Sequence, residues 1–148
     1  MIVAEKLKLR YHVEGGDLSQ AGEASSEMKM ALRRLGLTPD VIRKASICMY
    51  EGEINMVIHA NGGEVTVEVG LEDIIITLAD SGPGIPDVER AMEEGYSTAG
   101  SEARDLGFGA GMGLPNMKRY SDEMSVESTV GVGTTVRMKI LIEGAEGT

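Results

Sequence analysis

The chain has 148 residues, of which 20 are glycine, and its net charge is −10, so we expect one domain over residues 1–148 with its core at about 6–142. The acidic balance, the absence of tryptophan and the five aromatic residues exclude a nucleic-acid binder, because such a protein needs a cationic surface and stacking platforms. No apolar run is long enough to span a membrane, no secretory signal opens the chain, and Cys48 is the single cysteine, so we expect a cytoplasmic protein without membrane contact or disulfides.

The first elements are predicted from the spacing of apolar residues. Residues 6–13 alternate between apolar and polar side chains, which predicts a half-buried strand. Residues 18–35 carry apolar positions at helical spacing and predict a helix that a glycine ends. Pro39 suits the first turn of a second helix, which we expect to run to His59 or Ala60.

The second half of the chain predicts a hairpin followed by shorter elements. The apolar run at 74–79 predicts a central strand buried on both faces, paired with the alternating strand at 64–70. The order of elements predicts an α+β fold with helices on one face of a mostly antiparallel sheet. After the hairpin we expect a short helix, a long loop, a helix and two strands, at 85–95, 96–110, 114–120, 123–129 and 134–142.

The glycines are concentrated in three clusters. Ten of the 20 lie between positions 82 and 133, and eight of these ten lie in the stretches DSGPGIP (80–86), GFGAGMG (107–113) and GVGTT (131–135). A glycine-rich turn that leads into a helix presents backbone N–H groups to a phosphate. Neither GxxxxGK[ST] nor GxGxxG is present, which excludes a P-loop and a Rossmann fingerprint. The alternative is that these glycines only form turns.

A polar stripe lies on the second predicted helix. Glu51, Asn55 and His59 recur at four-residue intervals, so they share one face. Such a stripe is either a solvated helix face or part of a site. The stripe precedes the three glycine clusters in the chain, and this order favours a site.

Together these motifs resemble the ATP-binding domain of the GHKL superfamily of gyrase, Hsp90, histidine kinase and MutL ATPases. The resemblance rests on Glu51-xxx-Asn55, Asp80-x-Gly82-x-Gly84, the stretch ending GMGL, and Gly133-Thr134. The stretches DSGPGIPDVERAMEEGYSTAG and GFGAGMGLPNMKRYSD are most similar to bacterial anti-sigma factors and partner-switching serine/threonine kinases of the RsbW, RsbT and SpoIIAB type. The resemblance implies the Bergerat fold, a two-layer α/β sandwich.

The resemblance also implies a pocket for ATP or ADP. Asn55 would hold Mg²⁺, and Asp80 would accept a hydrogen bond from the adenine amino group. An acid at the end of an apolar strand needs a partner, although Asp80 is also typical of a plain turn. Gly82 and Gly84 would let the chain pass close to the base. Thr134 shares the parity of the inward-facing residues of its strand and would reach adenine or a water beside it.

A glycine-rich lid over residues 95–113 would close on the nucleotide. Arg104 is its only cation and would either touch a terminal phosphate or be solvated. Glycines would supply hinges and bare N–H donors. The full set of further nucleotide contacts implied by the resemblance is His59, Ile85, Arg104, Gly107, Gly109, Gly111, Met112, Gly113 and Leu114.

Glu51 is the implied catalytic residue. Related ATPases carry a glutamate here as general base, and in a kinase it would polarise a substrate serine hydroxyl. Histidine kinase domains carry asparagine here, because their histidine is already nucleophilic. We therefore expect a homodimeric protein serine/threonine kinase and anti-sigma-type regulator that phosphorylates a STAS-domain antagonist, with a sigma factor as a second candidate partner. A nucleotide-sensing binding module without phosphotransfer and a stand-alone ATPase are the alternatives.

Overall fold

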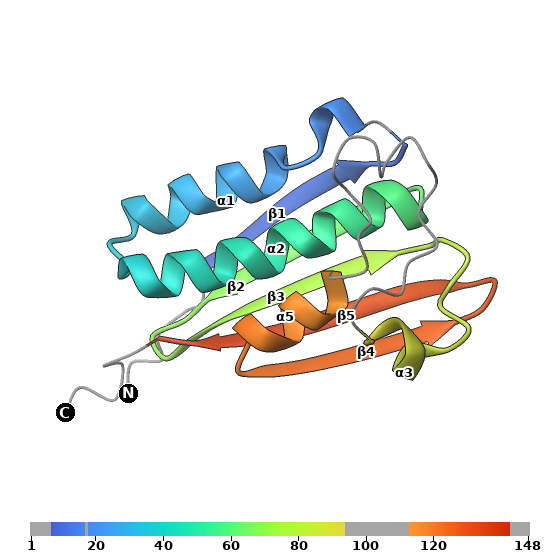
Figure 1. Ribbon diagram of the computed structural model, residues 1–148. Coiled ribbons are helices and arrows are strands. Elements are labelled where there is room, and N and C mark those ends of the chain that lie inside the picture. The colour runs from blue at the N-terminus through green and yellow to red at the C-terminus, as the bar shows by residue number, and fades with distance from the viewer. Residues whose placement is uncertain (1–6, 17, 94–112, 143–148) are drawn as a thin grey trace, which may run out of the picture.

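The computed structural model describes residues 7–16, 18–93 and 113–142, which form two layers, a sheet and helices packed on one of its faces (Figure 1). All neighbouring strands are antiparallel, in the order β1-β2-β3-β5-β4. The predicted α+β, two-layer architecture is confirmed. The strands are β1 (Leu7–Glu14), β2 (Gly62–Val69), β3 (Asp73–Asp80), β4 (Glu123–Thr129) and β5 (Gly133–Leu141).

The helical layer has α2 at its centre, with α1 on one side and α5 on the other (Figure 1). Thr38 caps α2 by accepting a hydrogen bond from the Val41 N–H at 3.4 Å, and the proline occupies the first turn as predicted. The helix ends at His59, also as predicted. The helical elements are η1 (Leu18–Gln20), α1 (Glu23–Arg34), α2 (Pro39–His59), α3 (Val88–Ala91) and α5 (Gly113–Tyr120).

Two predicted helices differ from the observed ones. The helix expected over 18–35 is broken, because Gly22 adopts a left-handed conformation with φ of 97° and α1 begins only after it. The helix expected from residue 85 begins at Val88, because Asp87 caps it by accepting the Arg90 N–H at 3.1 Å. It ends at Ala91 rather than near residue 95.

Strand β3 was predicted to be buried on both faces, and the structure shows this only in part. The face of β3 toward the helices is buried throughout, at Ile74, Ile76 and Leu78. On the other face Ile75 is 5% exposed, but Ala79 is exposed. No helix covers this second face in the described part of the chain (Figure 1), so burial there depends on the side chains of adjacent strands. The expectation of full burial is therefore wrong at the end of the strand.

Gly52 lies where α2 crosses β3. A Cβ at this position would lie 2.5 Å from Cδ2 of Leu78, a residue that is 3% exposed. We expect Gly52→Ala to lower the free energy of unfolding by about 1–2 kcal/mol, because overpacking outweighs the gain of about 1 kcal/mol in helix propensity. Urea denaturation measures the change. In a Leu78→Ala background the same substitution should become neutral or stabilising, and an equal loss in both backgrounds would contradict the packing explanation.

Candidate functional site

Asn55 and the first turn of α5 meet in the structure. Gly113 is the first residue of α5, and a Cβ on it would lie 3.0 Å from both Oδ1 and Nδ2 of Asn55. The first N–H groups of a helix have no partner within the helix and favour anions such as phosphate. An amide oxygen is an acceptable ligand for Mg²⁺. This contact therefore joins a candidate metal ligand to a candidate phosphate site.

Glu51 lies one turn before Asn55 on α2 and also faces α5. Its Oε2 accepts a hydrogen bond of 2.7 Å from Nδ2 of Asn116. Sequence reasoning missed Asn116, since an asparagine in an amphipathic helix has no distinguishing pattern. The structure thus places two of the three predicted stripe residues against the same short helix.

His59 is the third stripe residue and lies in the last turn of α2. Burial lowers the pKa of its imidazole, because desolvation disfavours the charged form. The ring is therefore uncharged at neutral pH.

Asp80 ends β3 and is held by the chain itself. Its Oδ1 accepts the Gly82 N–H at 2.9 Å and the backbone N–H of Thr134 at 3.2 Å. The bond from the Gly82 N–H is typical of an aspartate that begins a turn, which is the alternative interpretation of Asp80 given above. Both recorded bonds involve Oδ1, which leaves Oδ2 as the oxygen that would receive an adenine amino group. Oδ1 of this half-buried acid therefore needs no partner from outside the chain.

The glycines after Asp80 pack against protein. A Cβ on Gly82 would lie 2.7 Å from Cβ of Ala60, at the end of α2. Gly84 has φ of 81°, and a Cβ there would lie 2.5 Å from the carbonyl oxygen of Thr129. These contacts explain both glycines without a ligand. Their approach to a base stays a prediction.

Ser128 connects the loop after β3 to strand β5. Its Oγ accepts the Ile85 N–H at 2.7 Å, lies 2.8 Å from Oγ1 of Thr134, and lies 3.3 Å from the carbonyl oxygen of Gly133. A serine hydroxyl has one proton. When Ser128 donates that proton to the Gly133 carbonyl, Thr134 donates to Ser128 and its own oxygen can accept from a ligand. Thr134 is 8% exposed, which confirms that it faces inward.

We expect Ser128→Ala to weaken ATP binding by about 5- to 10-fold, because the loop and Thr134 lose a shared hydrogen-bond partner worth roughly 1 kcal/mol. Titration calorimetry with ATP and Mg²⁺ measures the change. Ser125→Ala is the matched control, since Ser125 is exposed on the open face of the same strand. Equal affinities for Ser128→Ala and the wild type would remove Ser128 from the site.

The remaining predicted contact residues divide into two sets. Leu114 is 7% exposed and belongs to the hydrophobic core, and Ile85 packs against that core. Their side chains therefore contribute to packing. The other predicted residues lie outside the described residues: Arg104, Gly107, Gly109, Gly111 and Met112.

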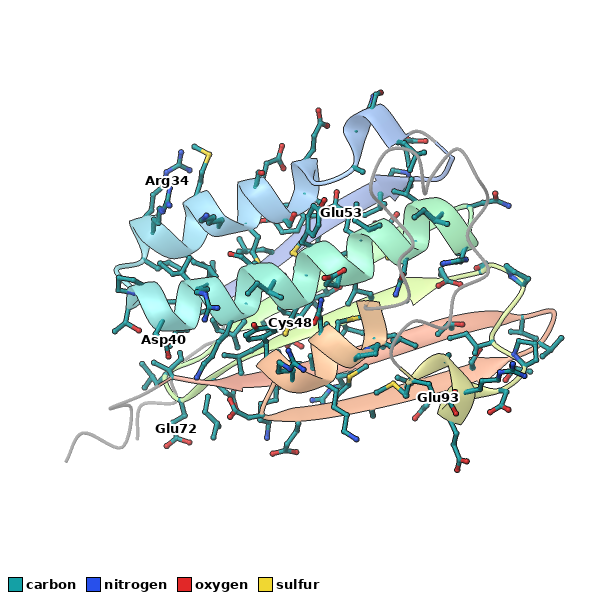
Figure 2. All side chains as sticks on the ribbon, viewed as in Figure 1. Arg34, Asp40, Cys48, Glu53, Glu72 and Glu93 are labelled. Atoms are coloured by element: carbon teal, nitrogen blue, oxygen red, sulfur yellow. The ribbon has the colours of Figure 1, made fainter. Side chains whose placement is uncertain are left out.

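Glu53 is a buried carboxylate that sequence reasoning also missed. It is 2% exposed and points from α2 toward the start of α1 (Figure 2), where it accepts the N–H groups of Gly22, Ala24 and Ser25 at 3.0–3.1 Å. It thereby caps α1 from a neighbouring helix. A surface hollow of about 580 Å³ lies beside this end of α1 and contains none of the predicted site residues. Because Glu53 occupies these donors, they are not available to an anionic ligand.

Comparison with known proteins establishes the family. Residues 16–140 match the model of the histidine kinase-like ATPase domain. The chain therefore belongs to this family, as the motifs predicted. Among the described residues, no helix is both long and apolar enough to cross a membrane.

Three named relatives show which kinds of protein within this family the chain is similar to. The chain is 38% identical to the serine/threonine-protein kinase RsbT of Bacillus subtilis over 87 residues, 56% of this chain and 59% of RsbT. It is 38% identical to an anti-sigma F factor of Caldanaerobacter subterraneus over 110 residues, 71% of this chain and 73% of that protein. It is 30% identical to the anti-sigma F factor of Bacillus subtilis over 140 residues, 89% of this chain and 92% of that protein. The predicted resemblance to partner-switching kinases and anti-sigma factors is confirmed.

A solved structure supports the fold. The mycobacterial sensor histidine kinase MprB superposes with a TM-score of 0.52 at 16% identity, covering 91% of this chain and 97% of that one. At this identity the likeness concerns the fold alone.

Proposed function

We propose that this protein binds ATP with Mg²⁺ and transfers the γ-phosphate to a serine of a STAS-domain partner. The observation that carries the proposal is the meeting of Glu51 and Asn55 on α2 with the N-terminal half of α5. It brings a carboxylate, an amide oxygen and helix N–H groups to one place. The kinase and anti-sigma names of the relatives support the same activity.

The residues present fit a nucleotide-bound magnesium ion. No group of three histidine, cysteine or carboxylate side chains in the described part of the chain is placed to hold a metal. Mg²⁺ at Asn55 would therefore take its other ligands from phosphates and water, which suits its preference for oxygen. When bound, the ion neutralises phosphate charge.

Glu51 would act as the general base. It would accept the proton of the serine hydroxyl as the serine oxygen bonds to the γ-phosphorus and the bond to the β-phosphate oxygen breaks, which releases ADP. An asparagine at this position would lack the basic oxygen. Glu51 therefore favours a hydroxyl acceptor over a histidine.

The partners belong to the same proposal, and the anti-sigma names of the relatives support a sigma factor among them. A STAS-domain antagonist would be the phosphate acceptor, and a sigma factor would be the competing ligand. We also propose that the chain acts in the cytoplasm as a homodimer of single-domain protomers. Nucleotide and phosphorylation state would then decide which partner is bound.

Incubation with Mg²⁺ and γ-labelled ATP tests the function. Candidate STAS-domain proteins from the same genome are added in parallel, and label is followed on protein and as free phosphate. Label on a STAS serine supports the kinase. Free phosphate without labelled partner favours the stand-alone ATPase, and neither product favours the nucleotide-sensing module.

A further inference from the structure

The contact between Asn116 and Glu51 joins two helices that are far apart in the chain. Nδ2 of Asn116 lies 2.7 Å from Oε2 of Glu51, and both side chains are half-buried. A hydrogen bond donated to a carboxylate is shorter and stronger than one between neutral groups. The amide nitrogen carries only donors, so Oε2 of Glu51 is the acceptor in this bond.

The rest of α5 fixes the place of Asn116. Met117 is fully buried in the core, and its carbonyl oxygen accepts a hydrogen bond of 3.7 Å from the Sγ of Cys48. One turn further, the Arg43 guanidinium lies 5.3 Å from the ring centre of Tyr120. These contacts hold α5 along the flank of α2 (Figure 2 labels Cys48). The packing of α5 against the core and α2 therefore fixes the position of the Asn116 amide.

The same helix also meets Asn55. Gly113 lies against the Asn55 amide at the start of α5, and Asn116 reaches Glu51 one turn later. Because α5 runs antiparallel to α2, its successive turns meet successive turns of the predicted stripe. One rigid element thus contacts the candidate base and the candidate metal ligand.

We propose that Asn116 is a positioning residue for phosphate transfer. This inference rests on the proposed kinase function. By donating to Oε2, Asn116 holds the carboxylate in one orientation and leaves Oε1 to accept the proton of the substrate hydroxyl. The amide does not touch substrate. It acts through Glu51.

Two substitutions separate this role from a structural one. Asn116→Ala removes the donor, and we expect kcat to fall by about 10- to 100-fold because the base loses its orientation. ATP affinity and melting temperature should stay near the wild-type values. Asn116→Asp places a second carboxylate beside Glu51, which disfavours ionisation of the pair. We therefore expect the acidic limb of the rate–pH profile to move upward by about one pH unit.

Lys118→Ala is the matched control, since Lys118 is exposed on the same helix. It should leave kcat and the pH profile unchanged. A wild-type pH profile in Asn116→Asp together with a wild-type kcat in Asn116→Ala would overturn the positioning role alone. Absence of phosphate transfer by the wild-type protein would overturn the kinase proposal, and the role of Asn116 with it.

Discussion

Glu51→Gln should lower the rate of phosphate transfer by about 10²- to 10⁴-fold, the usual contribution of a general base. Glutamine keeps the shape of the side chain, and its carbonyl oxygen still accepts the Asn116 hydrogen bond, so α2 and α5 keep their contact. The variant lacks only the oxygen that takes the proton. Single-turnover transfer from labelled ATP measures the rate, and calorimetry should show an ATP affinity within about twofold of the wild type.

Glu72→Gln is the control for this experiment. Glu72 is exposed in the turn between β2 and β3, away from α5 (Figure 2). Its neutralisation changes the net charge by the same amount but should not change the rate. Transfer by Glu51→Gln at the wild-type rate would show that Glu51 is not the base.

Asp80→Asn should weaken ATP binding by about 100-fold through a reversed hydrogen bond. The two backbone N–H groups of Gly82 and Thr134 require an oxygen at the Oδ1 position. The new NH₂ group must then replace Oδ2. There it would point a donor at the adenine amino group, which is itself a donor.

Inosine triphosphate makes this test specific, because it carries a carbonyl oxygen where adenine carries the amino group. The wild type should prefer ATP, and Asp80→Asn should lose or reverse that preference in calorimetric titrations. Asp87→Asn is the control, since Asn caps α3 as well as Asp does. If Asp80→Asn preferred ATP over inosine triphosphate as strongly as the wild type does, Asp80 would not contact the adenine amino group.

Local signals predicted helix α2 and the hairpin of β2 and β3. The limits of α2 follow from the Thr38 cap and Pro39 at one end and the left-handed Gly62 just beyond the other. The start of α1 was not predictable in this way. It depends on Glu53, a side chain about 30 residues away that supplies the cap from another helix.

In the candidate site, too, local features were predictable and contacts between distant parts of the chain were not. The spacing of Glu51 and Asn55 on one helix is a local property, so their common face was predictable. Their shared neighbour α5 was not, because the contact of Asn116 with Glu51 spans 65 positions. Ser128 likewise meets Ile85 across 43 positions. Contacts of this kind depend on how helices and strands pack, and an asparagine or a serine alone does not signal them.

A crystal structure of the protein with Mg²⁺ and a non-hydrolysable ATP analogue tests the central claim most directly. The account predicts the adenine amino group within hydrogen-bond distance of Oδ2 of Asp80. It also predicts the metal bound to Oδ1 of Asn55, with the phosphates at the N-terminus of α5. A nucleotide bound elsewhere, such as in the hollow beside α1, would contradict the account.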